Sequence, residues 1–286
     1  MFWSEIMSGQ FEAAVEKAKG VCAIVVGCME QHGHHLPLGQ DVIFTEGIAE
    51  RAAEKEPFVL FPSMYFGEKT GAGEFPGTVI FSSKLRFDIL TESCDEIARN
   101  GFKKILILNG HGGNGGVLAN FLRSTAHTKK DYVVMTRNEF QYSHKNLLAD
   151  IDAGEEFPEL TPEDIAYIRE AVEEKHACGH GGIMETAILN VINPESVDMS
   201  RCNVDDGTSR RRTGYLGKKG IGINGSGNFW LTDYPNSLAG EKLERANARI
   251  GKALLRKRIA LQAEAVRLLK QDDRVLEWND EFNAKW

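Results

Sequence analysis

The sequence predicts an α/β fold in which helices cover both faces of a central, mostly parallel sheet, giving three αβα layers. Two observations lead to this prediction. Short apolar runs rich in β-branched residues recur along the chain, and amphipathic stretches separate them. Strands of a parallel sheet are buried on both faces, so they read as continuous apolar runs. A chain of 286 residues can build one sizeable core, and residues 1–286 are expected to form a single domain.

Four apolar runs are expected to form the strands of this sheet. They cover residues 21–28, 58–66, 104–108 and 132–135. Each run is short and contains residues that suit a buried parallel strand. We therefore expect these runs to lie side by side in the middle layer.

The stretches between the first three runs predict crossover helices. Residues 42–55 and 85–99 carry apolar residues at spacings of three and four, which places those residues on one helical face. Asn100 and Gly101 follow the second stretch and are typical of a helix C-terminus. These helices would connect neighbouring parallel strands.

The second half of the chain has a different pattern. Around residues 140–175 the alternation fades into a polar, acidic stretch, which we interpret as an insertion beside the active site. Thr161 is expected to cap a helix within this stretch. Helices are also expected over residues 183–191 and 240–269, the latter with an interruption near Gly251.

Composition excludes several classes of partner. The net charge of −7 disfavours nucleic acid, because binding to phosphates requires a basic surface. The five cysteines are widely spaced without a CxxC pair, so reduced thiols are expected instead of disulfides or a Cys-based zinc site. The N-terminus does not resemble a signal peptide, and no apolar run is long enough to span a membrane. We expect a cytoplasmic protein without a nucleic acid or membrane partner.

The segment after the first predicted strand concentrates groups that bind metals. It contains Glu30, His32 and Asp41, with two further imidazoles at His34 and His35. In an open parallel sheet, ligands bind at the loops that leave the carboxyl ends of the strands. Carboxylate with imidazole is the ligand set of zinc, manganese and iron(II), whereas calcium prefers oxygen alone. A transition-metal site is predicted here.

A second loop, NGHGGNGG, follows the third predicted strand and has two interpretations. Gly110, Gly112 and Gly115 match the G-x-G-x-x-G fingerprint, which gives a nicotinamide-dependent oxidoreductase as an alternative function. Against this alternative, the loop follows an internal strand, and Asp131 begins the next strand where a ribose-binding carboxylate should end it. A role for His111 as a metal ligand fits better.

A third motif, HGGIMET, begins at His180 and precedes the predicted helix at residues 183–191. Its Glu185 falls in the first turn of that helix. Taken alone, a glutamate there is a favourable partner of the helix dipole, which is a structural role.

Together, the segments EQHGHHLPLGQD, NGHGGNGG and HGGIMET resemble, in order and separation, the motifs of the creatininase family. The segment EFPGT, which begins at Glu74, resembles the FPGT turn of that family. The likeness covers residues 1–195 well and the remainder weakly. It implies a metal-dependent hydrolase with a single α/β domain, usually assembled into homohexamers, that acts on a small molecule.

The resemblance also implies two divalent ions per subunit, which would be zinc, manganese or iron. Creatininase takes a glutamate ligand from the second loop, where this chain has Gly113. Similarity to relatives without that glutamate indicates Glu185 as the substitute. The ligands implied are Glu30 and His111 for one ion, His32 and Glu185 for the other, and Asp41 as the bridge.

The expected reaction is hydrolysis of a small cyclic or substituted amide. A hydroxide bridging the two ions would attack the carbonyl, since coordination lowers the pKa of water from about 15.7 toward roughly 7. His180 lies between Gly179 and Gly181, which let a substrate approach, and it is expected to protonate the leaving atom. Glu185 is counted with it as catalytic, since its loss would remove one ion. Hydrolysis of a formamide, or of a carbon–carbon bond in a cyclic polyhydroxy diketone, is an alternative that uses the same site.

Other candidate residues have open roles. His34 and His35 either face the substrate or form hydrogen bonds that brace the loop. Trp230 and Phe229, beside the glycine-rich residues 222–228, either close over a substrate or anchor the core. The remaining histidines are expected outside the catalytic site, namely His127 and His144 at the surface and His176 just before the third motif.

Overall fold

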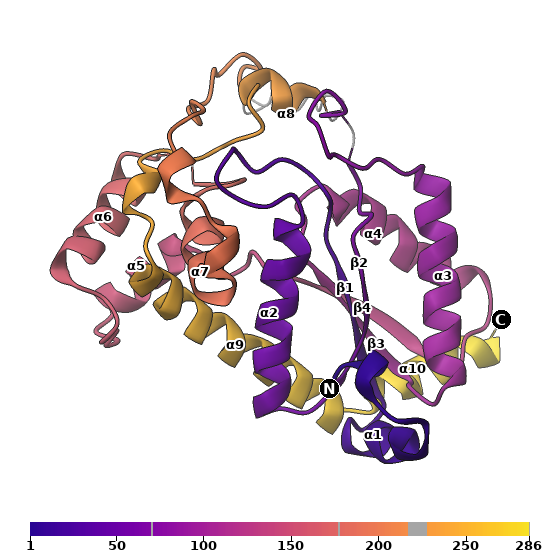
Figure 1. Ribbon diagram of the computed structural model, residues 1–286. Helices are drawn as coiled ribbons and strands as arrows, with labels where there is room; N and C mark the ends of the chain where they lie inside the picture. Colours follow the sequence, from indigo (N-terminus) through magenta and orange to yellow (C-terminus); the bar gives the residue numbers. More distant parts are fainter. Residues whose placement is uncertain (70, 177, 217–227, 286) are drawn as a thin grey trace.

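The computed structural model describes residues 1–69, 71–176, 178–216 and 228–285. At its centre lies a sheet of four strands in the order β2-β1-β3-β4 (Figure 1), and every neighbouring pair is parallel. The strands are β1 (Val21–Val26), β2 (Val59–Met64), β3 (Lys104–Asn109) and β4 (Val133–Asn138). Each predicted run therefore contains a strand, and the predicted parallel sheet is confirmed.

Side chains of β1 alternate between two separate cores. Val21, Ala23 and Val25 point into one core, whereas Cys22 and Ile24 point into the other. Helices α2 (Gln40–Lys55), α7 (Ile183–Ile192) and α9 (Ala248–Gln271) cover the first core, and α1 (Phe11–Lys17), α3 (Ser83–Arg99) and α4 (Asn114–Ser124) cover the second. Figure 1 shows α2 and α9 on one side of the sheet and α3 on the other, so the three αβα layers are confirmed.

Two predicted helix boundaries are confirmed by their capping contacts. Helix α3 ends at Arg99, directly before Asn100 and Gly101. Helix α6 (Pro162–Glu173) begins after Thr161, whose side chain accepts a hydrogen bond from the Asp164 amide. Such caps satisfy backbone donors that have no partner within the helix.

The stretch at residues 140–175 folds into helices α5 (His144–Asp152) and α6, whose apolar residues join the first core. Its description as an insertion into a single domain stays a prediction. The expectation that His144 lies at the surface is wrong, because this residue of α5 is buried and only 4% exposed. Burial lowers the pKa of His144 to about 4, so this imidazole is neutral. His127 is exposed, as predicted.

The long helix predicted over residues 240–269 begins later and has no break. Asn247 caps α9, since its side chain accepts hydrogen bonds from two amides of the first turn. At Gly251, an added Cβ would lie 1.9 Å from the carbonyl oxygen of Ala187 on α7. The predicted interruption was wrong because this glycine permits close packing of two helices instead of ending one.

The carboxyl ends of the strands lie level with one another. Val26 pairs with Met64 on one side and with Asn109 on the other, and Asn109 pairs with Asn138. Since β1 lies between β2 and β3, the connections that follow β1 and β3 run in opposite directions across the sheet. This reversal leaves a crevice at the strand ends, where parallel sheets bind their ligands.

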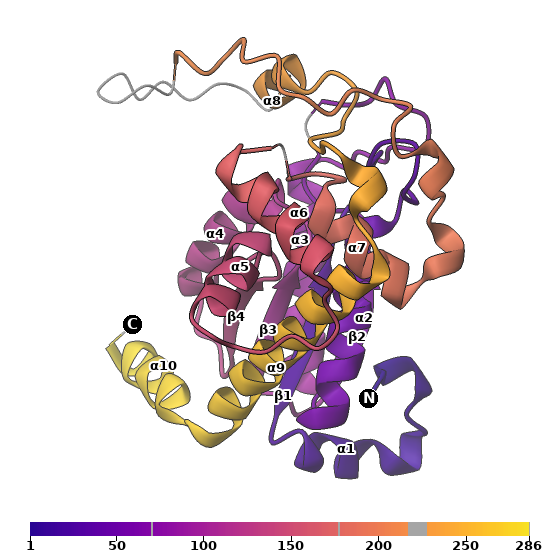
Figure 2. The ribbon, with the colours of Figure 1, turned by 90° about the vertical axis from the view of Figure 1, so that its left-hand side faces the viewer.

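Figure 2 shows α8 (Asn228–Asp233) above this edge of the molecule, at the opposite end from α1 and α10 (Arg274–Lys285). Short 3-10 helices occupy Trp3–Glu5, Ser8–Gln10, Thr125–His127, Pro194–Ser196, Met199–Arg201 and Leu243–Arg245. None of the described helices combines the length and apolar character required to cross a bilayer.

Candidate metal centre

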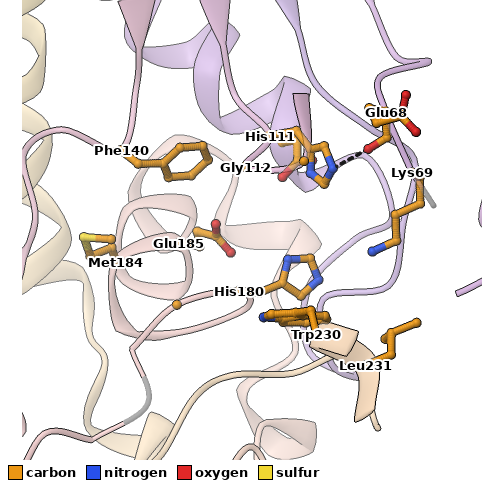
Figure 3. Close-up of a pocket in the computed structure, with 13 residues that line it drawn as sticks. Glu68, Lys69, His111, Gly112, Phe140, His180, Met184, Glu185, Trp230 and Leu231 are labelled. Atoms are coloured by element: carbon orange, nitrogen blue, oxygen red, sulfur yellow. Dashed lines mark hydrogen bonds and ion pairs between the residues drawn. The ribbon is translucent and has the colours of Figure 1, made fainter. Parts of the chain in front are cut away.

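The crevice at the strand ends brings the five predicted ligands together. Glu30 and His32 follow β1, and His111 follows β3, while Asp41 and Glu185 lie in the first turns of α2 and α7. All five are buried, and none is more than 7% exposed. Figure 3 shows His111, from the loop after β3, and Glu185, from α7, facing the same cavity.

Asp41 lies at the middle of this cluster, with its two oxygens facing different imidazoles. Its Oδ1 is 3.0 Å from Nε2 of His32, and its Oδ2 is 3.0 Å from Nδ1 of His111. Each imidazole also faces a second carboxylate, since His111 Nδ1 is 2.7 Å from Glu30 Oε1 and His32 Nε2 is 3.8 Å from Glu185 Oε2. The cluster therefore consists of two halves that share one carboxylate.

Backbone carbonyl groups orient both imidazoles. Nε2 of His111 lies 2.7 Å from the carbonyl oxygen of Glu68, and Nδ1 of His32 lies 3.2 Å from that of Glu30. A carbonyl oxygen only accepts, so each of these nitrogens carries the hydrogen and donates it. The other nitrogen of each ring is directed at the carboxylates, which is the arrangement found in histidines that bind metals.

The carboxylates of the cluster stabilise the protonated, positively charged form of both imidazoles. Burial disfavours a charged ring, but Asp41 raises the pKa of His32 to about 9. Burial likewise acts against the charge of His111, yet Glu30 and Asp41 raise its pKa to about 10. Without a metal, both rings are therefore protonated on both nitrogens and positively charged at neutral pH. Divalent ions would have to displace these protons, because metals bind the neutral imidazole.

The residues present fit divalent metal ions. Both Oε atoms of Glu30 and Oδ2 of Asp41 are buried and make no contact of hydrogen-bond geometry, although His111 and Lys69 lie beside them as ion-pair partners. Buried carboxylates are costly unless a cation or several donors compensate them. The donor set of carboxylates and imidazoles is the one that zinc, manganese and iron(II) accept.

Gly113 stands where the resemblance to creatininase implies a glutamate, and the structure gives a steric reason for its small size. A Cβ at this position would lie 2.4 Å from His111 Nε2 and 2.7 Å from the carbonyl oxygen of Glu68. The close contact between those two groups fills the space that a side chain would need. At the neighbouring Gly112, a Cβ would meet no atom within 4 Å.

His180 lies beside the cluster and lines the cavity. Its ring stacks on that of His32 with centroids 3.9 Å apart, and the Trp230 ring lies nearly perpendicular to it with centroids 5.1 Å apart. Nε2 donates a hydrogen bond to the carbonyl oxygen of Gln31 at 2.7 Å, so Nδ1 of the neutral ring has a free lone pair. Burial and the charge of His32 lower the pKa of His180 to about 3, which keeps the ring neutral.

Of the histidines with open roles, one braces the first loop and two contact acidic side chains outside the cluster. Nε2 of His35 lies 2.8 Å from the hydroxyl of Thr186, so His35 ties the first loop to α7. The side chain of His34 is 40% exposed, near Asp205. His176 pairs with Glu174 at 2.8 Å, in a group of side chains separate from the cluster.

Sequence reasoning missed several neighbours of the cluster. The buried Cys28 places its sulfur within 4.8 Å of ligand atoms of Glu30 and His111, but burial and the nearby carboxylates raise its pKa, so it is a neutral thiol. Lys69, just after β2, also contacts Glu30. Their positions are the one available signal, since Cys28 ends a predicted strand and Lys69 lies three residues after another, but a single cysteine or lysine there does not by itself indicate a site.

The cavity beside the cluster has a volume of about 510 Å³ and two kinds of wall. Its polar wall includes Lys69 and four of the predicted site residues, namely Asp41, His111, His180 and Glu185. Its apolar wall consists of Phe140, Met184, Trp230 and Leu231. Trp230 therefore lines the cavity, whereas Phe229 is 38% exposed. Residues 222–227 of the glycine-rich stretch lie outside the described residues.

A buried carboxylate–imidazole cluster at the carboxyl edge of a parallel αβα sheet is the kind of site at which α/β enzymes bind metal ions. The family model for creatininase, described as creatinine amidohydrolase, matches residues 4–266. The chain therefore belongs to the creatininase family, as the three motifs predicted. This membership makes the protein a hydrolase and decides against the oxidoreductase alternative.

Individual relatives agree with the family. A creatinine amidohydrolase from Pseudomonas putida is 24% identical over 206 residues, which cover 70% of this chain and 75% of that protein. A 3-dehydro-scyllo-inosose hydrolase from Thermotoga maritima is 31% identical over 93 residues, covering 31% and 29% of the two chains. Among solved structures, a mutant creatininase of Zn-Zn type superposes with a TM-score of 0.70 at 20% identity, covering 95% of this chain and 98% of that one.

Proposed function

We propose that the protein hydrolyses the carbonyl–nitrogen bond of a small cyclic or substituted amide at a centre of two divalent ions. The position of Asp41 carries this proposal, since its two oxygens face the imidazoles of His32 and His111 separately. The similarity to a creatininase of Zn-Zn type supports a pair of ions. The proposed ligands are Glu30 and His111 for one ion, His32 and Glu185 for the other, and Asp41 for both.

When bound, such ions would polarise the substrate carbonyl and lower the pKa of a water molecule. His180 supplies the proton transfer. Because its Nε2 is held by the Gln31 carbonyl, Nδ1 can accept a proton from the attacking water and deliver it to the leaving nitrogen. Glu185 accepts a hydrogen bond of 2.6 Å from the Gly181 amide, which fixes the carboxylate next to His32.

The cavity suits a small, partly planar substrate. Trp230, Phe140 and Met184 offer apolar surface in the same cavity as the carboxylates of Asp41 and Glu185. A volume of about 510 Å³ is within the usual range for small-molecule sites. The substrate would place its ring against these side chains and its carbonyl toward Asp41.

Carbon–carbon bond hydrolysis of a cyclic polyhydroxy diketone is the second candidate. The partial similarity to a 3-dehydro-scyllo-inosose hydrolase favours it. Both reactions begin with attack on a carbonyl, and they differ in whether His180 protonates a nitrogen or a carbon atom.

Metal analysis followed by a substrate screen tests the proposed reaction. The metal-loaded protein should hydrolyse at least one compound in a panel of cyclic amides, formamides and cyclic diketones, as followed by product analysis. His180→Ala should retain its metal and lose about 100-fold or more of the activity, the usual size of a general acid–base contribution. Full turnover by His180→Ala with metal still bound would contradict the role of His180.

A further inference from the structure

Lys69 enters the cavity from the loop that follows β2. Two hydrogen bonds fix this loop to the strand ends, because the Gly67 amide donates to the carbonyl oxygen of Gly27 at 2.9 Å and the Glu68 amide donates to Oδ1 of Asn114 at 2.6 Å. The side chain of Lys69 is 8% exposed. Figure 3 shows it extending toward His180 and Trp230.

The ammonium group has one carboxylate partner among the described residues. It contacts Oε2 of Glu30 and lies 5.6 Å from the centre of the Trp230 ring. The neighbouring carboxylate of Glu68 does not compensate it, because that group is bound by Arg86 and Ser83 instead. Lys69 therefore depends on Glu30 for its charge balance.

Glu30 is also a proposed metal ligand, and this has a consequence for Lys69. A metal ion on Glu30 would draw the carboxylate charge away from the ammonium group. Two divalent ions, their three carboxylate ligands and one hydroxide would together carry no net charge, so the positive charge of Lys69 would stay uncompensated. A buried ammonium without a counter-charge is costly, so the loaded site favours an anionic partner.

The space next to Lys69 can admit such a partner. Gly112 lines the same cavity, and a Cβ built there would meet no atom within 4 Å. The apolar residues Phe140, Met184 and Leu231 form another wall and offer no charge. A negatively charged group bound in this cavity would therefore pair with the ammonium group of Lys69.

We propose that Lys69 forms an anion subsite and that the substrate is a small carbonyl compound bearing a carboxylate. The inference rests on the proposed function, because it places this carboxylate beside the carbonyl that would be hydrolysed at the metal centre. The ammonium group would donate charge-assisted hydrogen bonds to the carboxylate, and these are among the stronger hydrogen bonds in proteins.

Isothermal titration calorimetry with two matched probes tests the subsite. N-acetylglycine carries a carboxylate, and N-acetylglycinamide has nearly the same shape without the charge. The metal-loaded wild type should bind N-acetylglycine about 10- to 100-fold more tightly, as expected for a hydrogen bond to a charged group. Lys69→Met should abolish this preference, and Lys69→Arg should keep most of it.

Metal content, measured first on every variant, separates the possible failures. A wild type without metal would contradict the proposed function and, with it, the subsite. A metal-loaded wild type that does not prefer the charged probe would overturn only the subsite. A Lys69→Met variant that keeps the preference would also overturn the subsite, since the metal ions alone would then explain the preference. A Lys69→Met variant that loses its metal would overturn it as well.

Discussion

Asp41 connects the two halves of the centre, and the contacts around it explain how single residues are selected there. Its oxygens reach different imidazoles only because each ring is held in one orientation by a backbone carbonyl group, that of Glu68 for His111 and that of Glu30 for His32. The nitrogen left over on each ring is the one that faces the carboxylates. At this scale, the backbone atoms beside the ligands matter as much as the ligands do.

Gly113 gives a test of this view at the scale of one methyl group. Gly113→Ala places a Cβ where His111 Nε2 meets the Glu68 carbonyl, so the ring must turn and the metal affinity should fall about 10- to 100-fold. Competition with a chelator measures the affinity. Gly112→Ala, whose Cβ enters open space, is the matched control and should bind metal as the wild type does. Equal affinities in both variants would argue against an orienting role for the Glu68 carbonyl.

At the scale of elements, one side chain links the ends of the central strands. Asn114, at the start of α4, donates hydrogen bonds to the carbonyl oxygen of Val26 and to Oδ1 of Asn109, and it accepts one from the Glu68 amide. It thereby joins the loops after β1, β2 and β3. His111 and Lys69 depend on this connection, because each lies within three residues of one of these anchoring points.

Asn114→Ala should therefore destabilise the fold as well as the site. Three hydrogen bonds are lost, two of them buried, and the Glu68 amide loses its acceptor, which predicts a loss of about 2 to 4 kcal/mol in the free energy of unfolding. Urea unfolding measures this difference. Asn120→Ala on the exposed side of the same helix should change the stability by less than about 0.5 kcal/mol. If the two variants proved equally stable, Asn114 would not be the link.

The elements show why part of the site was predictable from the sequence and part was not. The strands were found because buried parallel strands leave continuous apolar runs, and Glu30, His32, Asp41 and His111 follow those runs closely. Lys69 was missed because one lysine after a strand has no distinguishing pattern. The break predicted near Gly251 was wrong because this glycine makes room for the carbonyl group of Ala187.

At the scale of the whole molecule, one cavity combines the centre with an apolar wall formed by distant parts of the chain. Phe140 follows β4, Met184 belongs to α7, and Trp230 and Leu231 come from α8. Only the folded chain brings these residues to the metal ligands, so the sequence did not indicate the shape of the substrate site. The homohexamer and the cytoplasmic location stay predictions from the sequence.

Metal stoichiometry tests the central claim most directly. Elemental analysis of protein purified without chelators should find about two divalent ions per wild-type chain, and about one in Glu185→Gln, with unchanged circular dichroism. The matched control is Glu163→Gln, which alters an exposed first-turn glutamate of α6 and should leave two ions bound. One ion or none in the wild type, or two in Glu185→Gln, would contradict a centre in which Asp41 joins two metal sites.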